Sequence, residues 1–97
     1  MKILGLEHEL AGAMAEHFLE HAVAEARRVW ELTQAGLIRE SYFRADRNEA
    51  VLVLECGSVF DAEQALSALP FVQNNLIAFE LIPLRAYPGF ERLFARD

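Results

Sequence analysis

A histidine, a glutamate and an arginine lie on one side of a predicted helix and could carry proton-transfer chemistry. His21, Glu25 and Arg28 follow one another at spacings of four and three residues, so they are neighbours on a helical surface. Glu25 falls at the edge of the apolar side of this helix, beside Phe18. Partial burial disfavours a charged carboxylate and raises its pKa, which suits it to proton transfer. The alternative is that Glu25 simply pairs with Arg28 or His21.

Further polar side chains interrupt segments that otherwise look like buried strands, namely Arg39, Glu55 and Glu80. Such charges cost stability unless they are paired or hydrogen-bonded. They form either ion pairs between strands or subunits, or a polar patch in which Arg39 holds an anionic substrate. Tyr42 is either a core aromatic whose hydroxyl reaches water or a ligand-binding hydroxyl. Glu25 is therefore the candidate catalytic residue, with Arg39, Tyr42 and His21 as candidate substrate-binding residues.

Metal and nucleotide chemistry are not indicated by the motifs. His17, His21 and Glu25 recur every four residues, a spacing that could align metal ligands. His17 should face solvent, however, and nothing completes a site, so a solvated helix face is the favoured interpretation. We expect no metal and no other cofactor. No Gly-rich phosphate loop or Gly-x-Ser-x-Gly elbow occurs, and the single cysteine, Cys56, is interpreted as a small core residue.

Length and charge set the broad class of protein. The chain has 97 residues, a formal net charge of −6 and a hydrophobic content of 54%. It has no basic stripe for nucleic acid, no run long enough to span a membrane and no signal-peptide pattern. We expect a cytoplasmic protein that binds neither nucleic acid nor membrane. The apolar excess in so small a domain favours a face buried against a second copy.

The hydrophobic pattern predicts the elements that must position these residues: a strand at 2–6, a helix at 13–35, hairpin strands at 37–44 and 50–56, a helix at 58–69 and a last strand at 76–84. Gly36 should end the first helix, Ser58 should cap the second and Pro70 should stop it. The apolar arc of the first helix comprises Phe18, Leu19, Ala22, Val23, Ala26, Val29, Trp30 and Thr33.

This order of elements predicts a ferredoxin-like βαββαβ domain over residues 1–97, with a four-stranded antiparallel sheet and two helices on one face. The strand at 50–56 is apolar on both faces, so the sheet face away from the helices should be buried as well. We therefore expect a homodimer or higher homo-oligomer in which two sheets pack as an α/β barrel. Residues 85–97 form a C-terminal tail whose Phe90, Leu93 and Phe94 should pack on the body or on a partner.

One stretch carries a family resemblance. It consists of Leu66-Ser-Ala-Leu-Pro-Phe, a short turn, the strand Ile-Ala-Phe-Glu-Leu-Ile-Pro-Leu, and an arginine shortly before Tyr-Pro. With the spacing of the preceding helix and hairpin, the chain from Gln34 to Pro88 resembles muconolactone isomerase and its relatives in the dimeric α/β-barrel superfamily.

The resemblance implies a cofactor-free isomerase that shifts a proton in a small anionic lactone or related organic metabolite. It also implies an acid/base glutamate at Glu25. The lysine of the family falls on Ala22, so Arg39, Arg28 or Arg44 would have to supply the cation.

Two alternatives remain open because this fold hosts many activities. One is a non-catalytic dimeric ligand-binding or interaction module, in which Glu25 is locked in a salt bridge with no cavity beside it. The other is an oxygenase-like enzyme acting on an aromatic substrate, for which no residue is distinctive.

Overall fold

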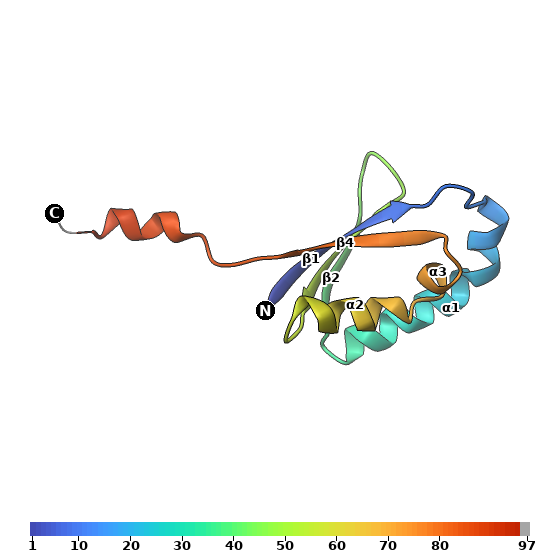
Figure 1. Cartoon of the computed structure of the whole chain (residues 1–97), viewed down its shortest axis with the longest axis horizontal. Coiled ribbons are helices and arrows are strands. Elements are labelled where there is room, and N and C mark those ends of the chain that lie inside the picture. The colour runs from blue at the N-terminus through green and yellow to red at the C-terminus, as the bar shows by residue number, and fades with distance from the viewer. Residues whose placement is uncertain (96–97) are drawn as a thin grey trace.

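The computed structural model describes residues 1–95 and places two long helices against one face of a four-stranded antiparallel sheet (Figure 1). The elements in order are β1 (Lys2–Glu9), α1 (Ala15–Gln34), β2 (Ile38–Phe43), β3 (Ala50–Glu55), α2 (Val59–Ser67), α3 (Pro70–Gln73), β4 (Ile77–Pro83) and the 3-10 helix η1 (Pro88–Leu93). The strand order is β2-β3-β1-β4. The predicted ferredoxin-like architecture is confirmed.

The core lies between the sheet and the helices because alternate strand residues point to that side. Its buried members are Ile3, Leu32, Ile38, Leu52, Leu54, Ala62, Leu66 and Leu69. One row across the sheet joins Ile38, Leu54, Ile3 and Pro83, which pair in that order. The start of β2 and the end of β4 therefore lie at the same end of the sheet, on opposite edges.

The end of α1 confirms the predicted role of Gly36. Gly36 has a φ of 80°, a conformation that costs glycine little and other residues more. Its N–H donates to the carbonyl of Thr33, and the N–H of Leu37 donates to the carbonyl of Leu32. These two bonds are those of a Schellman motif, which satisfies the last carbonyls of a helix. The turn directs the chain into β2.

The second helical segment also ends as predicted, with one addition. Ser58 caps α2 by accepting a hydrogen bond from the N–H of Asp61. Pro70 follows the end of α2, as expected, but it also begins the short helix α3, which the sequence pattern did not predict. Proline is favoured at the first position of a helix because the missing N–H is not needed there. This extra turn brings the N–H of Phe71 to the site described below.

A bulge changes which residues of β2 face the helices. Strict alternation along the strand would place Arg39, Ser41 and Phe43 on one face and Ile38 on the other. The register shifts between Ile38 and Glu40, which is a β-bulge. One extra residue reverses which side the following residues face, so that buried Ile38, Ser41 and Phe43 share the helix side with their partners on β3.

Only part of the apolar arc of α1 turns toward the sheet. Leu32, outside the arc, is the buried residue of this helix, whereas Leu19, Val23 and Trp30 are exposed. A helical pattern gives the width of an apolar arc, but the packing of α1 on the sheet decides which part of it turns inward.

The sheet face away from the helices, here called the outer face, has an apolar centre flanked by charged residues such as Glu40 and Glu80, and no helix within residues 1–95 covers it. Its half-buried aliphatic residues are Leu4, Leu6, Val51, Val53 and Ile82. The C-terminal tail leaves β4 and extends away from the body (Figure 1). Packing of the tail on a partner chain and dimerisation through the outer face both stay predictions. No helix within residues 1–95 is long and apolar enough to cross a membrane.

Candidate functional site

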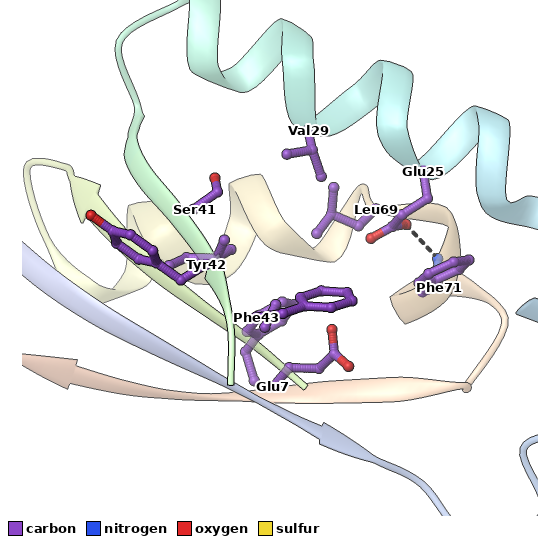
Figure 2. A pocket seen from close by; sticks show the side chains of 11 residues that line it. Glu7, Glu25, Val29, Ser41, Tyr42, Phe43, Leu69 and Phe71 are labelled. Atoms are coloured by element: carbon purple, nitrogen blue, oxygen red, sulfur yellow. Dashed lines mark hydrogen bonds between the residues drawn. The ribbon is translucent and has the colours of Figure 1, made fainter. Parts of the chain in front are cut away.

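A cavity of about 260 Å³ lies between α1 and the helix side of the sheet. We call it the inner cavity. It is lined by Glu7, Glu25, Val29, Ser41, Tyr42, Phe43, Ala50, Leu52, Leu69, Phe71 and Phe79. Most of these are apolar, and two carboxylates are the charged groups among them. In Figure 2, Glu25 reaches in from α1 and Glu7 from the opposite wall on β1.

Glu25 is held in place by α3 rather than by an ion pair. One carboxylate oxygen accepts a hydrogen bond of 2.9 Å from the N–H of Phe71, shown as the dashed line in Figure 2. The Phe71 ring also packs edge-on against Phe18, with ring centroids 5.1 Å apart. Burial raises the pKa of Glu25, and the Phe71 hydrogen bond partly offsets the rise. The predicted raised pKa is confirmed, whereas pairing with Arg28 or His21 is not found.

Glu7 was missed as a site residue because β1 was expected to end at Leu6. The strand continues to Glu9 through pairing with β4. Glu7 therefore keeps the alternation of Ile3 and Gly5 and faces the helices. Burial, and then the nearby charges of Glu25, Glu49 and Glu9, raise its pKa to about 7, while a hydrogen bond from the Ala50 backbone opposes the rise. The period-two pattern running through Ile3, Gly5 and Glu7 was the signal that could have found it.

A wider hollow of about 730 Å³, here called the outer groove, opens between α1 and the exposed edge of β2. Glu25, Val29, Ser41, Phe43 and Phe71 line both the inner cavity and the outer groove. The outer groove adds Ala22, Ala26, Trp30, Thr33, Arg39 and Glu40. The structure therefore brings the predicted pair Glu25 and Arg39 to one continuous hollow.

Arg39 is the candidate cation that the hollow contains. Its Nε donates to the carbonyl of Gly36, which fixes the guanidinium at the start of β2. The other two candidate cations are engaged elsewhere. Arg28 pairs with Glu31 at 3.1 Å, and Arg44 makes two bonds to Asp46, at 2.8 and 2.6 Å.

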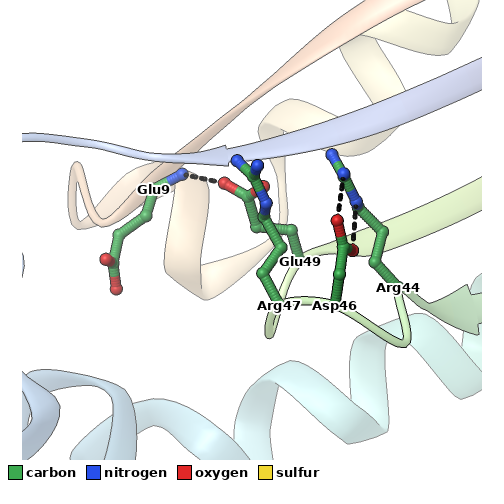
Figure 3. A network of polar contacts seen from close by, with 5 residues as sticks. All are labelled: Glu9, Arg44, Asp46, Arg47 and Glu49. Atoms are coloured by element: carbon green, nitrogen blue, oxygen red, sulfur yellow. Dashed lines mark hydrogen bonds and ion pairs between the residues drawn. The ribbon is translucent and has the colours of Figure 1, made fainter.

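The loop between β2 and β3 is tied down by its own charges (Figure 3). Besides the Arg44–Asp46 pair, Arg47 contacts Glu49 at 3.5 Å. The other carboxylate oxygen of Glu49 accepts a bond of 3.3 Å from the N–H of Glu9. This contact joins the loop to β1, and the negative charge of Glu49 contributes to the raised pKa of Glu7.

The remaining predicted residues take other positions. His21 does not line either hollow, and its Nε2 lies 4.0 Å from Glu20. Tyr42 lines the inner cavity, but its ring points away from it (Figure 2) and its hydroxyl donates to Glu40 at 2.6 Å. Substrate contacts by His21 and Tyr42 therefore stay predictions without geometric support here.

The charges in β3 and β4 lie outside the site. Glu55 accepts from the Met1 ammonium at 2.5 Å, which lowers its pKa. Glu80 is exposed on the outer face and pairs in register with Leu6. Within residues 1–95, no group of three or more His, Cys, Asp or Glu side chains is arranged to hold a metal ion. Burial raises the pKa of the Cys56 thiol, which makes it a poor nucleophile.

The carboxyl groups of Glu7 and Glu25 in the inner cavity can transfer protons to and from a bound molecule. Two half-buried carboxyl groups face one apolar cavity, and both have a raised pKa. Near neutral pH, a protonated member can act as an acid and an ionised member as a base. Arg39 in the adjoining outer groove can hold an anionic oxygen of a bound molecule.

Comparisons with known proteins define the fold. No family model and no curated protein matches this sequence. Among solved structures, the chain is similar to 5-chloro-2-hydroxyhydroquinone dehydrochlorinase (TftG) from Burkholderia phenoliruptrix AC1100 in complex with 2,5-dihydroxybenzoquinone. The TM-score is 0.71 at 14% identity, over 92% of this chain and 98% of that one. This likeness supports the ferredoxin-like fold along nearly the whole chain.

Proposed function

We propose that the protein is a cofactor-free, muconolactone isomerase-like enzyme that shifts a proton in a small, partly apolar and anionic cyclic metabolite. The observation that carries the proposal is a pair of half-buried carboxyl groups, Glu7 and Glu25, facing one cavity with no cation paired to either among residues 1–95. Burying carboxylates without a paired cation does not increase the stability of a folded protein. Raised pKa values at cavity residues are typical of acid/base sites.

In the proposed reaction, the Glu25 carboxylate removes a proton from the carbon next to a carbonyl. The electron pair of the broken C–H bond moves into the carbonyl to give an enolate. Protonated Glu7, or Glu25 itself, returns a proton to another carbon of the conjugated system, and the double bond moves. Arg39 holds the anionic group of the substrate. The apolar walls lower the local dielectric constant, which strengthens these interactions.

The substrate class is chosen from the site and from the structural neighbour. The cavity of about 260 Å³ suits a single small ring. The dehydrochlorinase of similar fold is named for a hydroxyhydroquinone and was solved with a dihydroxybenzoquinone. Unsaturated lactones bearing a carboxylate and hydroxylated quinones are both rings with acidic protons, and both belong in the test.

The decisive measurement is proton exchange rather than product formation. The protein is incubated in D₂O with each ring compound, and deuterium uptake at the carbon next to the carbonyl is followed by NMR. Glu25→Gln keeps an acceptor for the Phe71 N–H but cannot take a proton. It should lower exchange by about 10²- to 10⁴-fold, the usual contribution of a general base.

Glu20→Gln is the matched control, because Glu20 lies on the same helix and is exposed. It should leave exchange unchanged. Circular dichroism and light scattering should show Glu25→Gln to be folded like the wild type. Full exchange activity in Glu25→Gln would overturn the assignment. Binding of these rings by the wild type with no exchange would favour the non-catalytic binding module.

A further inference from the structure

A line of apolar residues on α1 is left uncovered next to the outer groove. Leu19, Val23, Ala26 and Trp30 follow one another at spacings of four, three and four residues, which places them on one stripe of the helix. All four are exposed, and the Trp30 side chain is 60% exposed. Such a contiguous stripe on a small protein marks an interaction surface.

The C-terminal tail of the same chain carries apolar side chains that do not pack on the rest of residues 1–95. Residues 85–95 extend away from the body (Figure 1). Within this tail, the rings of Tyr87 and Phe90 meet edge-on with centroids 5.0 Å apart. Leu93 and Phe94 are 76% and 82% exposed. The tail therefore makes an aromatic contact within itself, while Leu93 and Phe94 face solvent.

Charge favours the tail over a second copy of α1 as the group that covers this stripe. Residues 85–95 contain Arg85, Arg92 and Glu91, whereas α1 contains four glutamates and two arginines. The tail is net positive and α1 is net negative. Two copies of α1 would bring like charges together, while the tail brings opposite ones.

Sheet geometry places the tail of a second copy near the groove. Consider a dimer in which the two outer faces pack together, with the two-fold axis parallel to the strands. This rotation reverses the strand order of one sheet relative to the other, so β4 of one copy lies over β2 of the other. The row from Ile38 to Pro83 shows that β2 begins where β4 ends. In such a dimer, the tail of one copy leaves its sheet beside the start of β2 of the other, and it can reach the end of α1 around this edge strand.

We infer that residues 85–95 of a second copy of this chain dock along α1 over the outer groove, with Leu93 and Phe94 against Trp30. The docked tail closes the hollow that Glu25 and Arg39 line, so the site is complete in the oligomer. This inference extends the proposed homodimer but does not depend on the proposed chemistry.

Trp30 reports on the docking directly because it is the single tryptophan of the chain. In the wild type, its emission should be blue-shifted and its quenching by acrylamide reduced several-fold. In Leu93→Ser/Phe94→Ser, emission should shift to the red and quenching should rise to the level of a free indole. Equal quenching in the two proteins would overturn the inference. Light scattering on the same samples reports separately on the sheet-packed dimer.

Cross-linking distinguishes a second copy from the same chain. In a Cys56→Ser background, Ala26→Cys/Ala95→Cys treated with a short bismaleimide should give a covalent dimer of 22.0 kDa, twice the 11.0 kDa chain. Ala95→Cys alone and Ala45→Cys/Ala95→Cys, with Ala45 in the distant β2–β3 loop, should not. A product of single-chain mass, or no product, would overturn docking by a second copy. Neither measurement requires turnover, so failure of the isomerase proposal would be seen separately.

Discussion

At the scale of single residues, the unusual feature is Glu7, a carboxyl group that the fold places in an apolar cavity opposite Glu25. Its pKa is raised from 4.5 to about 7 by burial and neighbouring acids. The folded state therefore binds a proton more tightly than the unfolded state does between these pH values. The contribution of Glu7 to the free energy of unfolding is therefore greatest below pH 4.5, and it is lost as the pH rises through about 7.

Glu7→Gln should remove this loss, because the amide is neutral at every pH. Full burial would make the effect about 3 kcal/mol, but Glu7 is only half-buried, so screening reduces it to about 1 kcal/mol. Urea unfolding at pH 5 and pH 8 measures it. On going from pH 5 to pH 8, the free energy of unfolding of the variant should rise by about 1 kcal/mol relative to that of the wild type. Parallel pH profiles for the two proteins would contradict the raised pKa.

Only part of this site could be predicted from the sequence. Glu25 could, because a helical wheel places it at the edge of an apolar arc. Glu7 could not be assigned without the true end of β1, and Arg39 could not be separated from Arg28 and Arg44. Those two arginines have acidic partners three and two residues away, but so short a spacing does not tell which pairs form. Tyr42 was assigned to the site although the bulge in β2 turns its ring away.

At the scale of elements, the ends of the helices are set by local chemistry. The Schellman turn at Gly36 directs the chain from α1 into β2 and so sets the position of Arg39 at the edge of the groove. Similarly, α3 exists because Pro70 is well suited to begin a helix, and its Phe71 N–H holds Glu25. Segments of a few residues thus position Glu25 and Arg39.

Gly36→Ala should destabilise the protein by about 1–2 kcal/mol, because a side chain strains the left-handed conformation. The added Cβ meets no closer neighbour than Arg39 at 4.0 Å, so the cost is conformational rather than a clash. Thermal or urea unfolding measures it. Gly36→Asn should cost less, since asparagine tolerates this conformation. Gln34→Ala, two residues earlier and in ordinary helical geometry, should change stability by under about 0.5 kcal/mol. Equal stability of all three variants would contradict this account.

At the scale of the whole molecule, residues 1–95 leave two largely apolar surfaces uncovered, the outer face of the sheet and the stripe on α1. A chain that is 54% hydrophobic and this small cannot bury all of its apolar residues internally. The outer face would be covered by the sheet of a second copy, and the stripe by its tail. The two contacts would then support one assembly.

Val53→Asp tests the first of these contacts, because Val53 lies at the centre of the outer face on β3. Light scattering at micromolar concentration should give 22.0 kDa for the wild type and 11.0 kDa for the variant. Val53→Thr, which keeps the shape of the side chain, should remain dimeric. A wild type that is monomeric under these conditions would contradict burial of the outer face.

The sequence by itself determined the order of elements, the caps at Gly36 and Ser58, the break at Pro70 and the ferredoxin-like fold. These follow from local backbone preferences and from the period of apolar residues, both of which can be read from the amino-acid sequence. Only the tertiary structure decided which part of the α1 arc faces the sheet, where β1 ends and that Glu7 meets Glu25 across a cavity. Those outcomes depend on contacts between distant segments, whose packing free energy overrides local pattern.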